Sequence, residues 1–259
     1  MSATAEGFWA DVPFGPGVRR VECDANGLAA LDKPEGVLSH PNAPKDEGRS
    51  LVRALYDTGD ESFRWRDPAG RERRLWLINR LDSATSGVIL AASDGELARE
   101  IRAQFRRRRV LKVYEALVFG KPRQAAETWR DSLGVNRQGG RIRAVAGAGS
   151  LAAECRMALV RSLPGSPQLS LIQLEPRTGR SHQLRVQCAR RGLPIVGDGT
   201  YGDFGANRRF ARAGGSKRMF LHCLEVAFDY EFGGREHSFA ARAPLPPEFG
   251  LGLSGLGRY

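Results

Sequence analysis

The sequence of 259 residues contains few cysteines, and none of its apolar runs is long. The four cysteines are scattered without paired spacing, which argues against a zinc site and a disulfide framework and favours a reducing compartment. The uncharged stretches are far too short to span a bilayer, and the N-terminus has neither the basic start nor the apolar core of a secretion signal. We therefore expect a cytoplasmic protein that makes no membrane contact.

Acidic residues are also scarce relative to basic ones. There are 29 Asp and Glu against 40 Lys and Arg, so the formal net charge is +11 and the pI is about 10.1. Such an excess attracts polyanions, and nucleic acid is the first candidate, although a basic surface without such a partner is the alternative. Arginine dominates, and its planar guanidinium suits phosphate and base contacts, although a GC-rich genome would produce the same bias.

Hydrophobic patterns predict more strands than helices, with the strands in clusters. One helix is expected over 47–57 and another over 181–191. A further helix is expected to begin at a capping box formed by Ser93 and Glu96, with Leu97, Ile101 and Phe105 as its buried stripe. Strands are expected at the start of 28–42 and over 74–82, 87–93, 110–120, 151–162, 167–176 and parts of 216–246. This order predicts an α+β fold, with a largely antiparallel mixed sheet flanked by helices.

The stretch "LINRLDSATSG" (77–87) places a cation and an anion, Arg80 and Asp82, at the end of an apolar run. On an extended strand the two side chains would point to the same side. A carboxylate beside a guanidinium stays ionised and can act as a nucleophile or a base. The alternative is a surface salt bridge at a strand end.

Three further residues are chemical candidates. His182 and Arg185 would share one face of the helix over 181–191, although a helical histidine is more often structural. Neither a metal site nor a hydrolase triad is indicated around His182, because its neighbours lack the required spacing. Tyr114 would share a strand face with Lys112, either as a core residue or as a ring that stacks on a base.

A basic cluster follows the helix that begins near Ser93. We predict that it binds RNA, with a solvated helix face as the alternative. Its members are Arg106, Arg107, Arg108, Arg109 and Lys112.

The longest motifs occur in a recognisable order: "NRLDSATSGVILAAS", "KVYEALVFG", "RTGRSHQLRVQCARRGLPIVGDGTYGD", "FLHCLEVAF" and "FAARAPLP". This order resembles that of the RluA-type RNA pseudouridine synthases, from "LDKPEGVLSHP" to the C-terminal "APLPPEF". The resemblance implies the pseudouridine synthase catalytic fold with a central active-site cleft. It also implies one catalytic domain over residues 21–259, preceded by an extension of residues 1–20.

The resemblance further implies the roles of individual residues. Asp82 would be the catalytic nucleophile, Tyr114 would stack on the target uracil and is a candidate for proton removal, and Arg185 would pair with the catalytic carboxylate. Whether Asp82 attacks C1′, attacks C6 or removes the 2′ proton stays open. The implied substrate-binding residues are Arg80, which would hold the flipped nucleotide, and Thr85, Arg180, His182 and Gln183.

The expected activity is isomerisation of uridine to pseudouridine in structured ribosomal or transfer RNA, by a monomer that needs neither a cofactor nor a metal. One alternative is a non-catalytic RNA-binding or ribosome-assembly protein on the same scaffold, and another is a hydrolase that uses Asp82 and His182. Two positions depart from the family pattern, since Asn79 and Gln187 stand where many relatives have histidine. Residues 1–20 are too few for the N-terminal RNA-binding module of many relatives, so RNA binding would depend on the catalytic domain.

Overall fold

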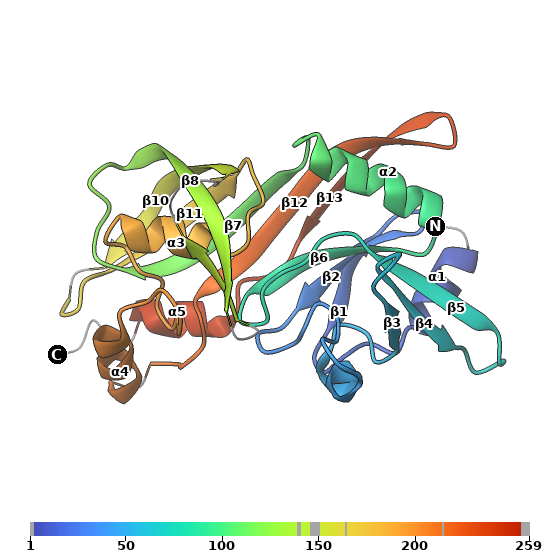
Figure 1. The fold of residues 1–259 in the computed structure, drawn as a ribbon, viewed down its shortest axis with the longest axis horizontal. Coiled ribbons are helices and arrows are strands. Elements are labelled where there is room, and N and C mark those ends of the chain that lie inside the picture. The colour runs from blue at the N-terminus through green and yellow to red at the C-terminus, as the bar shows by residue number, and fades with distance from the viewer. Residues whose placement is uncertain (1–2, 139–140, 146–150, 164, 214, 255–259) are drawn as a thin grey trace. The chain divides into compact units, whose positions relative to one another are not determined.

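The computed structural model describes residues 3–138, 141–145, 151–163, 165–213 and 215–254 (Figure 1). The chain divides into two compact units. The first unit contains residues 1–111 and 223–244, and the second contains residues 112–222 and 245–259. The chain therefore leaves the first unit, builds most of the second, and returns to the first for two strands.

The first unit is built around β6 (Ser86–Ala92), a strand whose seven residues are all buried. One edge of β6 pairs antiparallel with β2, from Lys33 opposite Gly87 to Leu28 opposite Ala92. Two residues of β5 pair antiparallel with β6, and β12 is also its neighbour in the sheet. The remaining strands extend this sheet outward. The other elements of the unit are α1 (Ala3–Ala10), β1 (Arg19–Cys23), β2 (Leu28–Lys33), a 3-10 helix (Pro44–Arg49), β3 (Leu55–Asp57), β4 (Ser62–Arg66), β5 (Glu72–Leu77), α2 (Gly95–Arg106), β12 (Leu221–Phe232) and β13 (Arg235–Arg242). The part of β12 that belongs to this unit starts at Cys223.

Helix α2 packs against β5 and β6 through the predicted apolar stripe (Figure 1). Leu97 and Ile101 are fully buried, which confirms the periodicity, while Phe105 is only partly buried. The predicted cap was wrong by one residue, because Asp94 is the N-cap. Its carboxylate accepts hydrogen bonds from the amides of Glu96 and Leu97 at 2.9 and 2.8 Å. A carboxylate at this position also interacts favourably with the helix dipole.

The helix predicted over 47–57 does not form. The 3-10 helix ends at Arg49, and the chain then becomes extended and leads into β3. Leu51 is buried because its backbone bonds to two other segments: its amide donates to Leu38 and its carbonyl accepts from Gly15. Leu55, in contrast, is 67% exposed. The apolar spacing that suggested a helix face therefore reflects two short segments with different partners.

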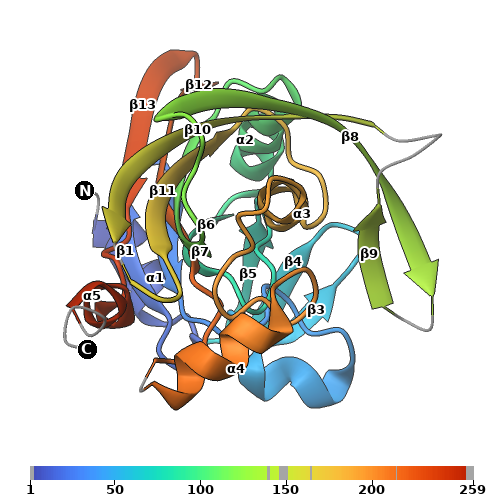
Figure 2. The ribbon, with the colours of Figure 1, turned by 90° about the vertical axis from the view of Figure 1, so that its left-hand side faces the viewer.

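The second unit contains a curved antiparallel sheet in the strand order β7-β11-β10-β8-β9. The strands curl around one helix, α3, as Figure 2 shows. The predicted strands over 110–120, 151–162 and 167–176 are confirmed, and the helix predicted over 181–191 forms as α3. The elements are β7 (Leu111–Phe119), β8 (Ala126–Gln138), β9 (Arg141–Val145), β10 (Leu151–Leu163), β11 (Leu169–Pro176), α3 (Gln183–Arg190), α4 (Phe204–Arg212) and α5 (Pro247–Ser254).

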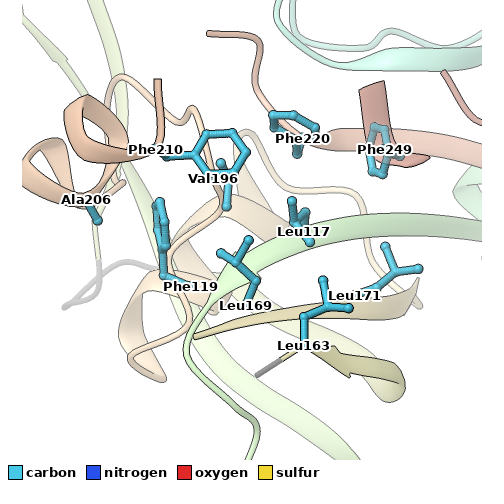
Figure 3. Close-up of a cluster of buried hydrophobic side chains, with 10 residues drawn as sticks. All are labelled: Leu117, Phe119, Leu163, Leu169, Leu171, Val196, Ala206, Phe210, Phe220 and Phe249. Carbon is cyan, nitrogen blue, oxygen red and sulfur yellow. The ribbon is translucent and has the colours of Figure 1, made fainter. Parts of the chain in front are cut away.

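The two faces of this curved sheet are covered differently. On one face, Leu117 and Phe119 of β7 pack with Leu169 and Leu171 of β11 and with side chains of α4 and α5 (Figure 3). On the other face, Ala153 of β10 packs against α3. Side chains alternate along a strand, so Tyr114, three residues before Leu117, lies on the face opposite the cluster of Figure 3. The complete cluster is Leu117, Phe119, Leu163, Leu169, Leu171, Val196, Ala206, Phe210, Phe220 and Phe249.

Gly87, the second residue of β6, lies at a point where only glycine fits. Its φ is +110°, and a Cβ atom there would lie 2.1 Å from the carbonyl oxygen of Cys223. We expect Gly87→Ala to lower the free energy of unfolding by roughly 4 kcal/mol or more, because backbone would have to move. Gly70→Ala is the control, since Gly70 also has a positive φ but no atom lies within 4 Å of its Cβ position.

For the control, the expected loss is about 1–2 kcal/mol, from the backbone conformation alone. Urea denaturation of both variants measures the difference. Similar losses in the two proteins would show that the contact with Cys223 is unimportant.

Candidate functional site

Asp82 lies in the connection between β5 and β6, and not on a strand. The prediction of an extended strand through residue 82 was wrong, because β5 ends at Leu77. The amide of Ile78 still bonds to the carbonyl of Leu90 at 2.9 Å, after which the chain leaves the sheet. The amide of Thr85 donates to the carbonyl of Asp82 at 3.0 Å and closes a turn. The Asp82 side chain is partly exposed on this turn.

The turn is held by the segment that follows β2. The hydroxyl of Ser39 accepts from the Leu81 amide at 3.0 Å and donates to the Leu81 carbonyl at 2.7 Å. The amide of Gly36 donates to the Ser83 carbonyl at 2.8 Å. Both neighbours of Asp82 are therefore fixed through their backbones.

Lys33 is the centre of this arrangement, and sequence reasoning missed it. The residue is fully buried, and its ammonium group donates to the carbonyls of Pro34, Val37 and Ser83 at 2.9, 2.7 and 3.1 Å. A buried ammonium group is costly unless its protons are bonded. A lysine at the end of the apolar strand "LAALDK" was the available signal, since the rest of that strand is buried.

Of the predicted substrate-binding residues in the first unit, Arg80 is accessible and Thr85 is not. The Arg80 side chain is 62% exposed, and its guanidinium lies 4.0 Å from a carboxylate oxygen of Glu61. Thr85 is buried at 3% exposure, so it supports the turn. The predicted basic cluster is exposed at the end of α2 and is accessible to an anion. Its exposed members are Arg106, Arg107, Arg108 and Arg109.

In the second unit, Arg185 of α3 is buried and fixed by Asp198. Its Nε and Nη2 donate to the two carboxylate oxygens at 2.9 and 2.7 Å, which is a bidentate pair. Burial opposes ionisation of Asp198, but the hydrogen bonds and charge of Arg185, with the amides of Thr200 and Tyr201, outweigh it. The pKa of Asp198 is therefore below its ordinary value. The predicted pairing of Arg185 with Asp82 stays a prediction.

His182 is the N-cap of α3 and not a residue of its first turn. His182 therefore precedes the helix, but its side chain and that of Arg185 both contact Tyr201. The backbone of His182 has a φ of 54°, which turns its side chain toward Tyr201, and its Nδ1 lies 2.9 Å from the Tyr201 hydroxyl oxygen. The guanidinium of Arg185 lies over the Tyr201 ring, 5.2 Å from its centre. Tyr201 thus connects the predicted residues His182 and Arg185.

Gln183 is buried and bonded within the second unit, and its predicted contact with substrate stays a prediction. Its amide oxygen accepts from the Thr178 hydroxyl and the Arg180 amide, and its nitrogen donates to Glu154 and Gln187. These four bonds use the hydrogen-bonding capacity of the side chain. Arg180 is partly exposed, and its Nε donates to the carbonyl of Ala152 at 3.2 Å.

Tyr114 and α3 lie on the same face of the curved sheet. Tyr114 is opposite Leu174, and Leu174 is opposite Met157, so the three side chains share one face. Met157 and Ala153 are four residues apart on β10 and also share that face, where Ala153 packs against Val186 of α3. The strand pairing therefore places the predicted stacking ring on the side that carries Arg185. Lys112 belongs to the same face of β7 and is partly buried.

The two departures from the family pattern have structural explanations. The side-chain oxygen of Asn79 accepts from the Leu90 amide at 2.8 Å, so it extends the β5–β6 ladder by one bond. Gln187 is fully buried and donates to the carboxylate of Asp131 at 2.8 Å. Arg191 donates to the same carboxylate and lies over the ring of Trp129. Neither Asn79 nor Gln187 has to contact a substrate to explain its presence.

Two features are absent from the described part of the chain. No group of three or more His, Cys, Asp or Glu in that part of the chain is placed to hold a metal ion. In the same ranges, no helix combines the length and apolar character needed to cross a membrane.

Comparisons with known proteins agree on one family. The model of the RNA pseudouridylate synthase family matches residues 27–190. A ribosomal large subunit pseudouridine synthase C of Vibrio parahaemolyticus is 35% identical over 233 residues, which are 88% of this chain and 66% of that protein. A tRNA pseudouridine synthase C of Vibrio cholerae is 28% identical over 214 residues, with 79% and 83% covered.

The chain spans just under two thirds of the length of its ribosomal relatives, as the match to a third protein also shows. This protein, the ribosomal large subunit pseudouridine synthase C of Vibrio vulnificus, is 32% identical over 84% of this chain and 63% of its own length. Among solved structures, human RNA pseudouridylate synthase domain containing 1 superposes with a TM-score of 0.65 at 23% identity, covering 90% of this chain and 88% of that one. This likeness confirms the predicted fold.

The bonds of the Lys33 ammonium group predict a large effect of its removal. Lys33→Met retains an unbranched apolar side chain but leaves the carbonyls of Val37 and Ser83 without this donor. We expect the free energy of unfolding to fall by roughly 1–3 kcal/mol, since an unsatisfied buried group costs about that much and, of these carbonyls, only that of Ser83 keeps another donor in the described part of the chain, the Gly36 amide. Lys45→Met is the control, because Lys45 is exposed. Equal denaturation midpoints for the two variants would contradict this role of Lys33.

The pair of Arg185 and Asp198 predicts an acid-sensitive contribution to stability. Because folding lowers the pKa of Asp198 from its ordinary value of 3.8, the pair stabilises the protein fully above that pH. The contribution is lost as the pH falls below 3.8 through the lower pKa of the folded state. Asp198→Asn should therefore be less stable than wild type at neutral pH, and the difference should shrink in acid. Thermal unfolding across this pH range measures it, and a constant difference would contradict the assignment.

Proposed function

Because the chain belongs to the RNA pseudouridylate synthase family, we propose that it converts specific uridines of structured RNA into pseudouridine. The observation that carries this proposal is the arrangement of Asp82, a partly exposed carboxylate on a turn whose backbone is fixed on both sides. A reacting group must be held in place before the substrate arrives, since a movement of about 1 Å can cost a hundredfold in rate. The family match over residues 27–190 includes this turn and α3.

The proposed reaction is an isomerisation. The bond between N1 of uracil and C1′ breaks, the base rotates, and C5 bonds to C1′, while the C5 proton is released and N1 gains a proton. No electrons are gained or lost overall, so we propose that the enzyme needs neither a cofactor nor a metal. Asp82 would start the cleavage as an ionised carboxylate.

Other residues would bind and orient the uridine. We propose that Tyr114 stacks on the uracil after the base leaves the RNA helix, which offsets part of the unstacking cost of a few kcal/mol. Arg185, whose side chain Asp198 orients, would keep the Asp82 carboxylate ionised. Arg80 would hold the flipped nucleotide, and Arg106–Arg109 with Lys112 would bind phosphates, which makes binding strongly dependent on salt.

The partner would be RNA, and the names of the relatives indicate its class. Relatives include ribosomal large subunit and tRNA pseudouridine synthases, so we propose ribosomal or transfer RNA as the substrate. We further propose that both units belong to one catalytic domain over residues 21–259, preceded by an N-terminal extension, and that the protein acts as a cytoplasmic monomer.

Release of tritium tests the catalytic role of Asp82. RNA labelled with [5-³H]uridine should lose tritium in the presence of the protein, because C5 exchanges its hydrogen for C1′. Asp82→Asn should reduce the rate by about a thousandfold or more, since it removes the reacting carboxylate, while RNA affinity should stay nearly unchanged. Asp229→Asn is the control, because Asp229 is an exposed carboxylate that accepts a bond from Ser238.

Full tritium release by Asp82→Asn would exclude Asp82 as the catalytic residue. RNA binding by the wild-type protein without release from total ribosomal and transfer RNA would favour a non-catalytic RNA-binding protein. Mapping pseudouridines in cells with and without the gene would then identify the modified site.

A further inference from the structure

Two aromatic rings near the Asp82 turn form a parallel stack. The rings of His40 and Tyr56 have centres 4.7 Å apart and planes 8° from parallel. Both side chains are partly exposed. Tyr56 also contacts Phe63, a fully buried residue of β4, with ring centres 4.8 Å apart and planes tilted by 56°. The stacked pair is therefore anchored to the core through Phe63.

This stack is attached to the same turn that carries Asp82. His40 follows Ser39, whose hydroxyl bonds to both the amide and the carbonyl of Leu81. Leu81 precedes Asp82 directly in the chain. His40 and Asp82 are thus the immediate neighbours of two residues that share two hydrogen bonds, and all of them belong to the first unit.

An exposed cation accompanies the stack. Arg80 is held only loosely by Glu61, because 4.0 Å is beyond hydrogen-bond distance and exposed ion pairs contribute little. Burial and the charge of Glu61 raise the pKa of Tyr56 to about 12, against the opposing charges of Arg80 and Arg102. The phenol of Tyr56 therefore stays neutral at physiological pH, and the Arg80 guanidinium is near enough for its charge to act on this phenol.

We propose that the His40–Tyr56 stack is a platform for the base of a nucleotide adjacent to the target uridine, and that Arg80 binds the phosphate between them. This inference rests on the proposed function. A uridine that leaves the helix deprives its neighbour of a stacking partner, and an aromatic surface replaces that contact. Arg80 would exchange its long contact with Glu61 for a charge-assisted hydrogen bond to phosphate.

A double-mutant cycle between protein and RNA tests the platform. The probe is an RNA hairpin whose loop contains one uridine, together with versions that lack the base on the 5′ or the 3′ side of it. Binding is measured in the Asp82→Asn background so that no turnover occurs. We expect His40→Ala to weaken binding of the intact hairpin by about tenfold, which is within the range of one lost stacking contact.

On one of the two abasic hairpins, His40→Ala should have little further effect, because the base that it supports is already absent. Tyr56→Phe should bind like its parent, since the ring is retained, and His40→Phe should restore binding if His40→Ala also lowers the thermal stability. The matched control is His237→Ala. His237 is partly exposed and stacks on Tyr230 of the same unit, with centres 5.1 Å apart, but it lies on the β12–β13 hairpin.

Equal losses on intact and abasic RNA, or no loss at all, would overturn the platform. Tritium release by the wild-type protein without coupling in the cycle would remove only the platform and leave the proposed function in place. Coupling without tritium release would show the opposite, that the base is bound but the proposed reaction does not occur.

Discussion

A buried ammonium group that must be bonded to carbonyl oxygens governs the geometry around Asp82. Lys33 has no solvent to satisfy its charge, so the chain places the carbonyls of Pro34, Val37 and Ser83 around it. The first two come from the segment after β2, and the third comes from the turn after β5. One side chain therefore ties together two segments that are 50 residues apart in sequence. This connection helps to fix the backbone on both sides of Asp82.

The second unit fixes the side chain of Arg185, its predicted functional residue, by another means. Arg185 is oriented by a buried carboxylate, Asp198, whose remaining capacity is taken by two backbone amides. A bidentate pair limits the rotation of the guanidinium, and the Tyr201 ring supports it from the side. In both places the protein fixes a charged group before any substrate binds. Protein sites with such fixed groups stabilise charge without reorganising during a reaction.

The sequence predicted elements where a single pattern dominated. Strand β6 was found because it is one continuous apolar run, and helix α2 because its apolar residues follow one helical period. The helix over 47–57 was wrong because Leu51 and Leu55 follow a helical spacing by coincidence and have different surroundings. The Asp82 residue was found from its motif, whereas Lys33 was missed because its role depends on carbonyls supplied by residues far along the chain. Helix α4 was missed for a related reason. Its Phe210 is buried by packing in the cluster around β7.

The division of the chain has a consequence for the order in which the protein folds during its synthesis. Residues 1–111 leave the ribosome first, yet β6 gains its neighbour β12 only after Cys223 and the following residues have been made. Until then one edge of a fully buried strand is without its neighbour, and exposed strand edges favour aggregation. The second unit is similarly completed late, by Phe249 of α5. Neither unit can therefore reach its final stability before the residues beyond 222 have been made.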